Sequence, residues 1–358
     1  MSEVEQRRRA ASARLAEHKI DALLVSSPAN VQYLSGYAGS NGLMLLTGRE
    51  AVFFTDPRYR LEASREVTCR VSVAKKALIE AAAEVLKRKR IKKIGFETAW
   101  MRHEDFQKLK EALPMGVSLQ PVGRVIEEQR MVKSADEITR IRKSVEANSE
   151  AYSRTLRRVR PGVREQDIAA ELDFQMRMLG AQSTAFETIV AVGDRSALPH
   201  ARPSARRLEE NELLLIDMGA MLDGYASDMT RVAYSGTPPK KVRDMYRAVL
   251  EAQLAAINAV RPGITADKVD SAARSVLKRH KLDRQFIHST GHGLGLEIHE
   301  PPRLGKKDKT RLQAGMAITI EPGAYVEGLG GVRIEDTVLV TQSGCEVLTP
   351  TPKEFISL

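Results

Sequence analysis

The stretch of residues 213–231 constrains the fold more than any other part of the chain, because it places acidic side chains inside an apolar pattern. It opens with an apolar run typical of a buried strand, and Asp217 stands where that run should continue. An Asp-Gly turn signal follows at residues 223–224, and residues 225–231 have the pattern of a returning strand. The stretch is therefore predicted to be a hairpin that carries one aspartate on each side.

With the turn centred between Leu222 and Asp223, Asp217 lies directly opposite Asp228. Cross-strand partners share a face, with Cβ atoms ~5 Å apart. Two buried carboxylates so placed repel each other and lose their hydration, and a cation between them compensates both effects. A metal site is therefore predicted at this hairpin. The alternative is that one aspartate is a turn or cap residue and that the register differs by one.

Three further polar groups interrupt apolar or glycine-rich surroundings downstream. His292 lies in a Gly-His-Gly sequence, where the missing side chains let the backbone come close to whatever the imidazole contacts. Glu321 ends an apolar strand predicted over residues 317–320, and Glu335 lies in a strand predicted over residues 331–340. The glycine-rich loop between these strands would place the two glutamates side by side. Two carboxylate pairs and one imidazole together predict a metal cage.

The donor set of this cage indicates which metals it holds. Four carboxylates and one imidazole, without a thiolate, favour Mn²⁺ or Co²⁺ before Zn²⁺. So many negative charges exceed what a single divalent ion balances. Two ions ~3.5–4 Å apart, with bridging carboxylates and a bridging water, balance the charge, and sites of this kind perform hydrolysis.

Three histidines of the same region lie beside prolines or next to the glycine-rich segment, and they are His200, His288 and His299. A single histidine is usually explained by the core or the surface. Together with His292, however, these three indicate a site of proton transfer and substrate orientation.

The chain is predicted to form two domains with a boundary near residue 128. Residues 1–128 alternate helical and strand-like segments, which predicts a mixed α/β domain. Residues 125–133 are predicted to be the connection. Ser134 and Glu137 then form a capping box that opens a long amphipathic helix.

The C-terminal domain, residues 129–358, contains a weak internal repeat. Two predicted helix pairs each have Arg-Pro-Gly after the first helix, at residues 160–162 and 261–263, a separation of 101 residues. Strands follow each pair. The pattern predicts an α+β domain with two related halves that face each other.

The net charge of +10 raises the alternative of a nucleic-acid-binding protein. Basic runs occur at residues 7–9, 87–93 and 306–309, but they are scattered, and aromatic residues make up only 5% of the chain. Binding to DNA or RNA is therefore expected to be weak and to vanish by physiological salt. The chain shows no membrane-length apolar run and no signal peptide, and its two cysteines favour a reducing cytoplasm.

The chain resembles the pita-bread metallopeptidases, and within them the proline-specific branch that includes aminopeptidase P and prolidase. The motifs that carry the resemblance lie at residues 217–231, 291–300, 319–323 and 331–337. Residues 1–128 resemble the creatinase-type N-terminal domain of that branch, including Phe-Thr-Asp-Pro-Arg-Tyr at residues 54–59. One departure is Val232, where the family commonly has threonine.

The resemblance implies a C-terminal pita-bread domain with pseudo-two-fold halves after a smaller α/β domain, and it implies roles for individual residues. The implied ligands of two metal ions are Asp217, Asp228, His292, Glu321 and Glu335. The implied catalytic or substrate-contacting residues are His200, His299, Glu321, His288 and Arg333. Tyr225 is also expected near the metals.

The activity implied by the resemblance is hydrolysis of the bond between an N-terminal residue and a following proline. Relatives are commonly homodimers, so a homodimer is expected. Two rivals share the fold: creatinase, which acts without metal, and non-catalytic binding modules, which typically lose ligand residues. A strict dipeptidase must recognise the free carboxylate of its substrate, normally by an arginine. The resemblance places Arg333 in both subtypes, so it does not decide. Selectivity would have to come from the N-terminal domain, through the Tyr33–Gly42 loop or Arg49 and Arg58. The spacing does not establish that reach, so an aminopeptidase P-like site is expected, with prolidase as the alternative.

Overall fold

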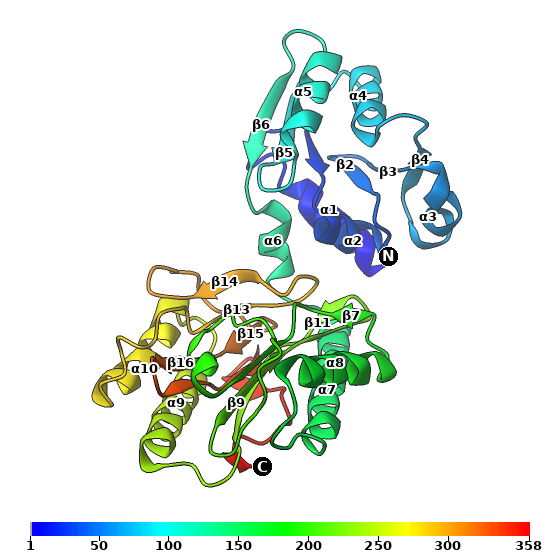
Figure 1. Ribbon diagram of the computed structural model, residues 1–358. Helices are drawn as coiled ribbons and strands as arrows, with labels where there is room; N and C mark the ends of the chain where they lie inside the picture. Colours follow the sequence, from blue (N-terminus) through cyan, green and yellow to red (C-terminus); the bar gives the residue numbers. More distant parts are fainter. Residues whose placement is uncertain (1) are drawn as a thin grey trace. The chain divides into compact units, whose positions relative to one another are not determined.

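The chain divides into two compact units at Arg130, and Met131–Leu358 form the second unit (Figure 1). The structure is a computed structural model and describes residues 2–358. The first unit builds its hydrophobic core around a sheet, and the second has three clusters of buried apolar residues. The predicted α/β and α+β classes of the two parts are confirmed.

The first unit contains a mixed six-stranded sheet in the order β4-β3-β2-β1-β5-β6 (Figure 1). Its central strand β1 is buried along its whole length, because it is an unbroken apolar run. β1 pairs antiparallel with β2 and parallel with β5. The strands are β1 Ala22–Val25, β2 Leu43–Thr47, β3 Ala51–Thr55, β4 Arg70–Val73, β5 Lys93–Glu97 and β6 Ser118–Val122.

Helices flank this sheet, and α4 has the most strongly one-sided apolar pattern among those of the first unit. The connection predicted over residues 125–133 begins with a helix, α6, that the sequence pattern did not predict. Two of its residues, Val125 and Ile126, are buried, and this burial stabilises a helix that lacks a strong sequence signal of its own. The helices are α1 Glu3–Ala13, α2 Pro28–Ser35, η1 Pro57–Tyr59, α3 Arg60–Glu66, α4 Leu78–Arg88, α5 His103–Ala112 and α6 Val125–Arg130.

The second unit contains two helix pairs that pack against curved sheets (Figure 1). The predicted capping box opens α7: the Ser134 hydroxyl accepts a bond from the Glu137 N–H, and the Glu137 carboxylate accepts one from the Ser134 N–H. The helices are α7 Ala135–Leu156, α8 Glu165–Met178, η2 Gly193–Ala197, α9 Lys240–Ala259 and α10 Ala266–Arg279.

The strands of this unit form two main sheets, in the orders β20-β12-β9-β8 and β14-β13-β15-β18-β19, and two small ones, β11-β10-β7 and β16-β17. The strands are β7 Ser183–Thr184, β8 Ile189–Val192, β9 Leu213–Met218, β10 Ala220–Leu222, β11 Tyr225–Ala226, β12 Met229–Tyr234, β13 Gly291–Gly293, β14 Glu300–Leu304, β15 Ala317–Ile320, β16 Gly323–Val326, β17 Gly330–Arg333, β18 Asp336–Val340, β19 Cys345–Val347 and β20 Ile356–Ser357.

The internal repeat is visible in the backbone bonding of the two halves. Gly162 donates to the Leu208 carbonyl in the first half, and Gly263 donates to the Leu312 carbonyl in the second. Both glycines have positive φ, 94° and 84°, which is why a glycine follows Arg-Pro in each half. Counted from these two leucines, Asp217 and Glu321 occupy matching positions, because both pairs are 104 residues apart.

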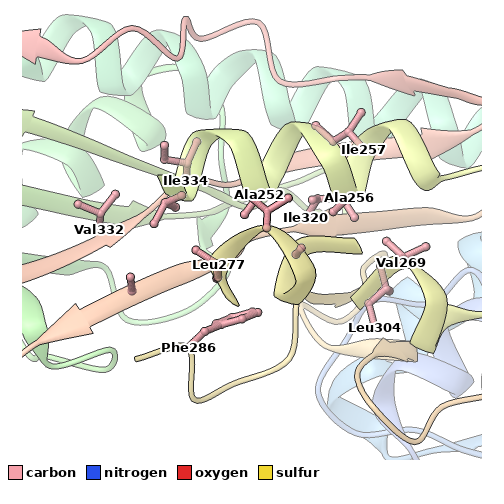
Figure 2. Packing of buried hydrophobic residues seen from close by; sticks show 14 of the residues in the cluster. Ala252, Ala256, Ile257, Val269, Leu277, Phe286, Leu304, Ile320, Val332 and Ile334 are labelled. Carbon is pink, nitrogen blue, oxygen red and sulfur yellow. The ribbon is translucent and has the colours of Figure 1, made fainter. Parts of the chain in front are cut away.

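The largest core of the second unit lies between α9, α10 and the neighbouring strands (Figure 2). Small residues on α9 let α10 pack closely, and larger side chains from the strands fill the remaining space. The residues labelled in Figure 2 are Ala252, Ala256, Ile257, Val269, Leu277, Phe286, Leu304, Ile320, Val332 and Ile334. Among the helices that the structure describes, none combines the length and the apolar character needed to cross a bilayer.

Candidate metal centre

The hairpin that carries the two aspartates turns at Asp223 and Gly224, one residue later than predicted. Both residues have positive φ, 50° and 77°, as a two-residue hairpin turn of the primed type requires. The residue opposite Asp217 is therefore Thr230 and not Asp228, so the predicted direct pairing is wrong. The register differs by two residues, however, which keeps Asp228 on the same face as Asp217. The two carboxylates are diagonal neighbours, and the charge of Asp217 helps to raise the pKa of Asp228.

The two glutamates meet at a break between two ladders. The β15–β18 ladder ends with Ile320 opposite Asp336, and the β16–β17 ladder starts beyond it in the same register. Glu321 consequently lies opposite Glu335, side by side as the sequence predicts. The single strand predicted over residues 331–340 is wrong, because the chain leaves one sheet for the other at Glu335.

His292 on β13 points its ring at the same acidic group. Its Nε2 atom lies 3.5 Å from Asp228 Oδ2 and 3.4 Å from Glu321 Oε1. Its Nδ1 atom lies 2.9 Å from the Gly293 carbonyl oxygen. Because a carbonyl only accepts, Nδ1 carries a proton, and in the neutral ring Nε2 then presents its lone pair to the carboxylates. This is the tautomer that a metal ligand needs.

The glycines on either side of His292 are required by the close packing of neighbouring strands and not by a contact of the imidazole. A Cβ atom on Gly291 would collide with the Thr319 carbonyl oxygen, and one on Gly293 would collide with the Pro301 carbonyl oxygen. The glycines therefore allow β15 and β14 to approach β13 closely. The prediction that they bring the backbone close to the partner of the imidazole is corrected in this respect.

The electrostatics of the site fit divalent cations. Burial first, and then the neighbouring carboxylates, raise the pKa values of Asp228 and Glu335 well above their ordinary values. Asp217 Oδ1 and Glu335 Oε1 are buried without a hydrogen-bond partner in the described residues. Ligand atoms of Asp228, His292 and Glu335 lie within 4.8 Å of one another. Orphaned oxygens in an acidic, buried cluster are the donors that a hard or borderline cation satisfies.

Arg333 joins the two halves of this cluster. Its guanidinium is buried and donates to Asp217 Oδ2 at 2.6 Å, to Thr230 Oγ1 at 3.1 Å and to the Tyr325 hydroxyl at 2.7 Å. Thr230 in turn donates to Glu335 Oε2 at 2.7 Å. Arg333 therefore orients Asp217 directly and Glu335 through a hydroxyl, as is common around metal ligands.

Tyr325 is a site residue that the sequence does not reveal. Its hydroxyl lies 2.9 Å from His288 Nε2, while His288 Nδ1 lies 2.8 Å from the Ser289 carbonyl. The tyrosine thus links His288 to Arg333. The tyrosine expected near the metals was Tyr225, whose hydroxyl donates instead to Glu137. Tyr325 lies in an ordinary β-strand pattern, so no local signal distinguishes it.

The other predicted histidines lie close to residues of the cluster. The ring centroids of His299 and His292 are 4.4 Å apart. His299 keeps an exposed surface, yet the protein around its ring, and then the charge of His292, lower its pKa to about 4. The backbone next to His200 reaches the cluster, because Arg333 donates to the Pro199 carbonyl at 3.3 Å. The charge of the exposed His200 contributes to lowering the pKa values of both His288 and His299.

The titration of His288 predicts a pH dependence of stability in the metal-free protein. Burial, and then the charge of Arg333, lower its pKa from 6.5 to about 4. Between these values the unfolded chain binds the proton and the folded chain does not, so this histidine makes the free energy of unfolding fall as the pH falls from 6.5 to 4. A His288→Gln variant is expected to lack this contribution, which is at most ~1.4 kcal/mol per pH unit.

Urea denaturation of metal-free wild type and variant between pH 4.5 and pH 7 measures the two slopes. Carboxylates with raised pKa values act in the opposite direction in both proteins, so the difference between the slopes isolates His288. Equal slopes would contradict the assignment of a neutral, buried His288.

Comparison with known proteins identifies the family of this chain. The chain matches metallopeptidase family M24 over residues 139–342 and the creatinase/prolidase N-terminal domain over residues 7–132. An Xaa-Pro dipeptidase of Pyrococcus furiosus is 39% identical over 341 residues, 95% of this chain and 96% of that protein. The solved structure of an Xaa-Pro dipeptidase from Bacillus anthracis has a TM-score of 0.97 at 36% identity and covers 99% of this chain and 100% of its own. An X-Pro aminopeptidase from Thermotoga maritima has a TM-score of 0.89 at 34% identity, over 95% and 98% of the two chains.

This chain belongs to metallopeptidase family M24 and carries the N-terminal domain of the creatinase/prolidase type. It is therefore an enzyme that hydrolyses peptide bonds with the help of divalent metal. The non-catalytic binding module is excluded as its class, and the pita-bread fold inferred from the sequence motifs is confirmed.

Proposed function

We propose that this enzyme hydrolyses the bond between an N-terminal residue and a following proline, with two divalent ions held by the five residues Asp217, Asp228, His292, Glu321 and Glu335. The observation that carries the proposal is the convergence of two carboxylate pairs and one correctly oriented imidazole, with two buried oxygens left without hydrogen bonds. The names of the Pyrococcus furiosus and Bacillus anthracis relatives support the proline specificity.

The residues around the ligands divide the work of the reaction. When bound, divalent ions at this site polarise the scissile carbonyl and lower the pKa of a water molecule. Glu321 accepts a proton from the attacking water and passes it to the proline nitrogen as the carbon–nitrogen bond breaks. The hydroxyl remainder of the water bonds to the carbonyl carbon. His200 and His299 orient the substrate at the exposed side of the cluster.

A peptide bond to proline has no N–H group, so a peptidase that recognises that donor cannot act on it. The proposed site makes no use of that donor, because it acts on the carbonyl and on the nitrogen as it leaves. Mn²⁺ or Co²⁺ is the proposed metal, with Zn²⁺ as an alternative. The proposal also places the enzyme in the cytoplasm as a homodimer. Metal analysis of the purified protein tests the proposed metal, and light scattering tests the homodimer.

For substrate length we propose a preference for dipeptides, although the sequence motifs alone led us to expect an aminopeptidase P-like site. An exposed arginine close to the cluster supports this preference. Arg303 on β14 pairs across the strands with His292, and its charge contributes to the lowered pKa of His299. Its guanidinium can therefore bind the carboxylate of a proline at the C-terminus. Activity on longer peptides is the second candidate, because the similar Thermotoga maritima structure is named an X-Pro aminopeptidase.

The wild-type enzyme is therefore expected to have a higher kcat/KM for Ala-Pro than for Ala-Pro-Ala or a longer Xaa-Pro peptide. Arg303→Gln is expected to raise KM for Ala-Pro roughly 10–100-fold with little change in kcat, because it removes one charge-assisted contact. Steady-state kinetics on the three substrates measure both effects. Equal activity on all three peptides, and an Arg303→Gln variant like wild type, would support the aminopeptidase instead.

A further inference from the structure

The segment that carries His200 is tied at both ends to one buried carboxylate. Glu165, at the start of α8, is completely buried. Its Oε1 atom accepts bonds from the Val192 N–H at 2.9 Å and from Arg195 Nε at 3.0 Å. Its Oε2 atom accepts bonds from the N–H and the hydroxyl of Ser204, at 2.9 Å and 2.6 Å. The histidine lies between these attachment points.

The segment that carries His288 is held in a comparable way from α10. Asp270 is completely buried and accepts two bonds from Thr290, from its hydroxyl at 2.8 Å and from its N–H at 3.3 Å. Its other oxygen accepts Arg274 Nε at 2.7 Å. The same guanidinium donates to the backbone carbonyls of Phe286 and His288 itself. Asp270 and Arg274 thus hydrogen-bond to the segment on both sides of His288, at Phe286 and at Thr290.

The segment that carries His299 has a third such pair. Lys133 Nζ lies 3.0 Å from Glu300 Oε2, and both side chains are almost inaccessible, at 1% and 2%. Glu300 Oε1 accepts a bond from the Glu297 N–H at 3.1 Å. The Lys133 N–H donates to the Gly315 carbonyl, which fixes the cation to the neighbouring loop. Glu300, held by Lys133, therefore fixes the turn of residues 297–300 that contains His299.

These pairs are poorly explained as sources of stability alone. Each acid is buried, while Arg195 and Arg274 keep partly exposed side chains and Lys133 does not. Burying a charged group costs so much hydration that well-packed apolar residues are often as stable or more so. Moreover, the first two acids, Glu165 and Asp270, lie on the second helices of the two halves but not at equivalent positions. Glu165 corresponds to Ala266 in the repeat, and Asp270 corresponds to Ala169. The two halves thus reach the same arrangement through unrelated residues, and in each case the anchored segment carries a histidine of the site.

We infer that three buried acids, each paired with a cation, position the three histidine-bearing segments for the reaction: Glu165–Arg195 for His200, Asp270–Arg274 for His288, and Glu300–Lys133 for His299. The kinetic part of this inference rests on the proposed function. The six residues do not act on the substrate themselves, and each pair acts through its own histidine. A shift of about 1 Å in a substrate-positioning group is enough to cost ~10²-fold in rate.

Hydrogen exchange followed by mass spectrometry tests the anchoring without any assay of activity. In the metal-free full chain, Glu165→Gln is expected to speed exchange in residues 193–204 and to leave the other two segments unchanged. Asp270→Asn is expected to act on residues 286–290, and Glu300→Gln on residues 295–301. Asp173→Asn is a matched control on α8, because Asp173 accepts a bond from Thr188 and touches none of these segments.

Double-mutant cycles test the kinetic part. Glu165→Gln alone is expected to lower kcat for Ala-Pro ~10–100-fold with metal content retained. In a His200→Ala background the same change is expected to cost less than about twofold, because the group it positions is already gone. In a His288→Ala background its effect is expected to remain in full. Asp173→Asn is expected to leave kcat and KM unchanged.

Additive effects within each acid–histidine pair would overturn the inference, as would exchange that rises uniformly over the second unit. Arg195→Lys and Arg274→Lys give milder versions of two anchors, because they keep the charge and lose part of the bonding. They keep the test decisive if a carboxylate variant fails to fold. A wild-type enzyme that does not hydrolyse Ala-Pro would refute the proposed function, while the exchange experiment would still decide the anchoring.

Discussion

Asp228→Asn is expected to abolish hydrolysis of Xaa-Pro peptides and, at the same time, to stabilise the metal-free protein. The first effect follows because an amide lacks the charge that a divalent ion requires at this position. The second follows because burial and the charges of Asp217 and Glu321 make the Asp228 carboxylate costly without metal. Wild type is therefore expected to gain thermal stability from Mn²⁺, and the variant is expected to gain little.

Thermal unfolding with and without Mn²⁺, metal analysis and activity together measure this prediction. Wild type is expected to bind about two ions per chain. Glu346→Gln serves as the control, because Glu346 is an exposed carboxylate that pairs with Arg142 away from the cluster. A variant of Asp228 that retains activity and full metal content would show that this residue is not a ligand. Glu335→Gln is expected to behave as Asp228→Asn does.

Replacing His200 or His299 by alanine is expected to lower kcat by ~10²–10⁴-fold while both metal ions remain bound. The reason is that, in the proposed mechanism, these histidines orient substrate or exchange protons, whereas the acids and His292 supply the ligand atoms. The ring of His299 is close to His292, so its loss also tests how strictly the two tasks are separated.

Metal analysis of the same samples distinguishes the outcomes for these histidines. Loss of metal from His299→Ala would make that residue a ligand and contradict its assignment. His280→Ala provides the control, since His280 is an exposed histidine that pairs with Glu251. An unchanged kcat for both site variants would remove the histidines from the reaction.

The alternation of side chains between the two faces of a strand explains why the acidic cluster was predictable although the hairpin register was not. Both residues of the 223–224 turn adopt positive φ, and the sequence did not distinguish this turn from one placed a residue earlier. That change moves the partner of Asp217 by two residues, and side chains alternate with a period of two. Asp217 and Asp228 therefore share a face in either register, so the chemical prediction survived a wrong pairing.

The internal repeat was predictable because the same backbone conformation requires the same residue, glycine, in each half. Each Arg-Pro-Gly needs a positive φ at its glycine, and the carbonyl that accepts the glycine N–H lies at a matching position in each half. Sequence similarity between the halves is weak elsewhere, because core packing accepts many apolar combinations.

The residues that sequence reasoning missed act over long separations. Tyr325 matters through Arg333 and His288, and Glu165 through a segment that begins 27 residues later. Nothing in the local pattern distinguishes a buried glutamate on α8 from an exposed one, because its partners are known only once the chain has folded. The short helix α6 was missed for the related reason that tertiary burial stabilises it.

The release of free proline from Ala-Pro, with Ala-Ala as the matched substrate, tests the central claim most directly. The enzyme is assayed after exhaustive chelation and again after reloading with Mn²⁺, next to Asp228→Asn treated in the same way. The reloaded wild type is expected to cleave Ala-Pro and not Ala-Ala, and the chelated enzyme and the variant are expected to cleave neither. Full activity after chelation, or equal cleavage of the two dipeptides, would contradict the account.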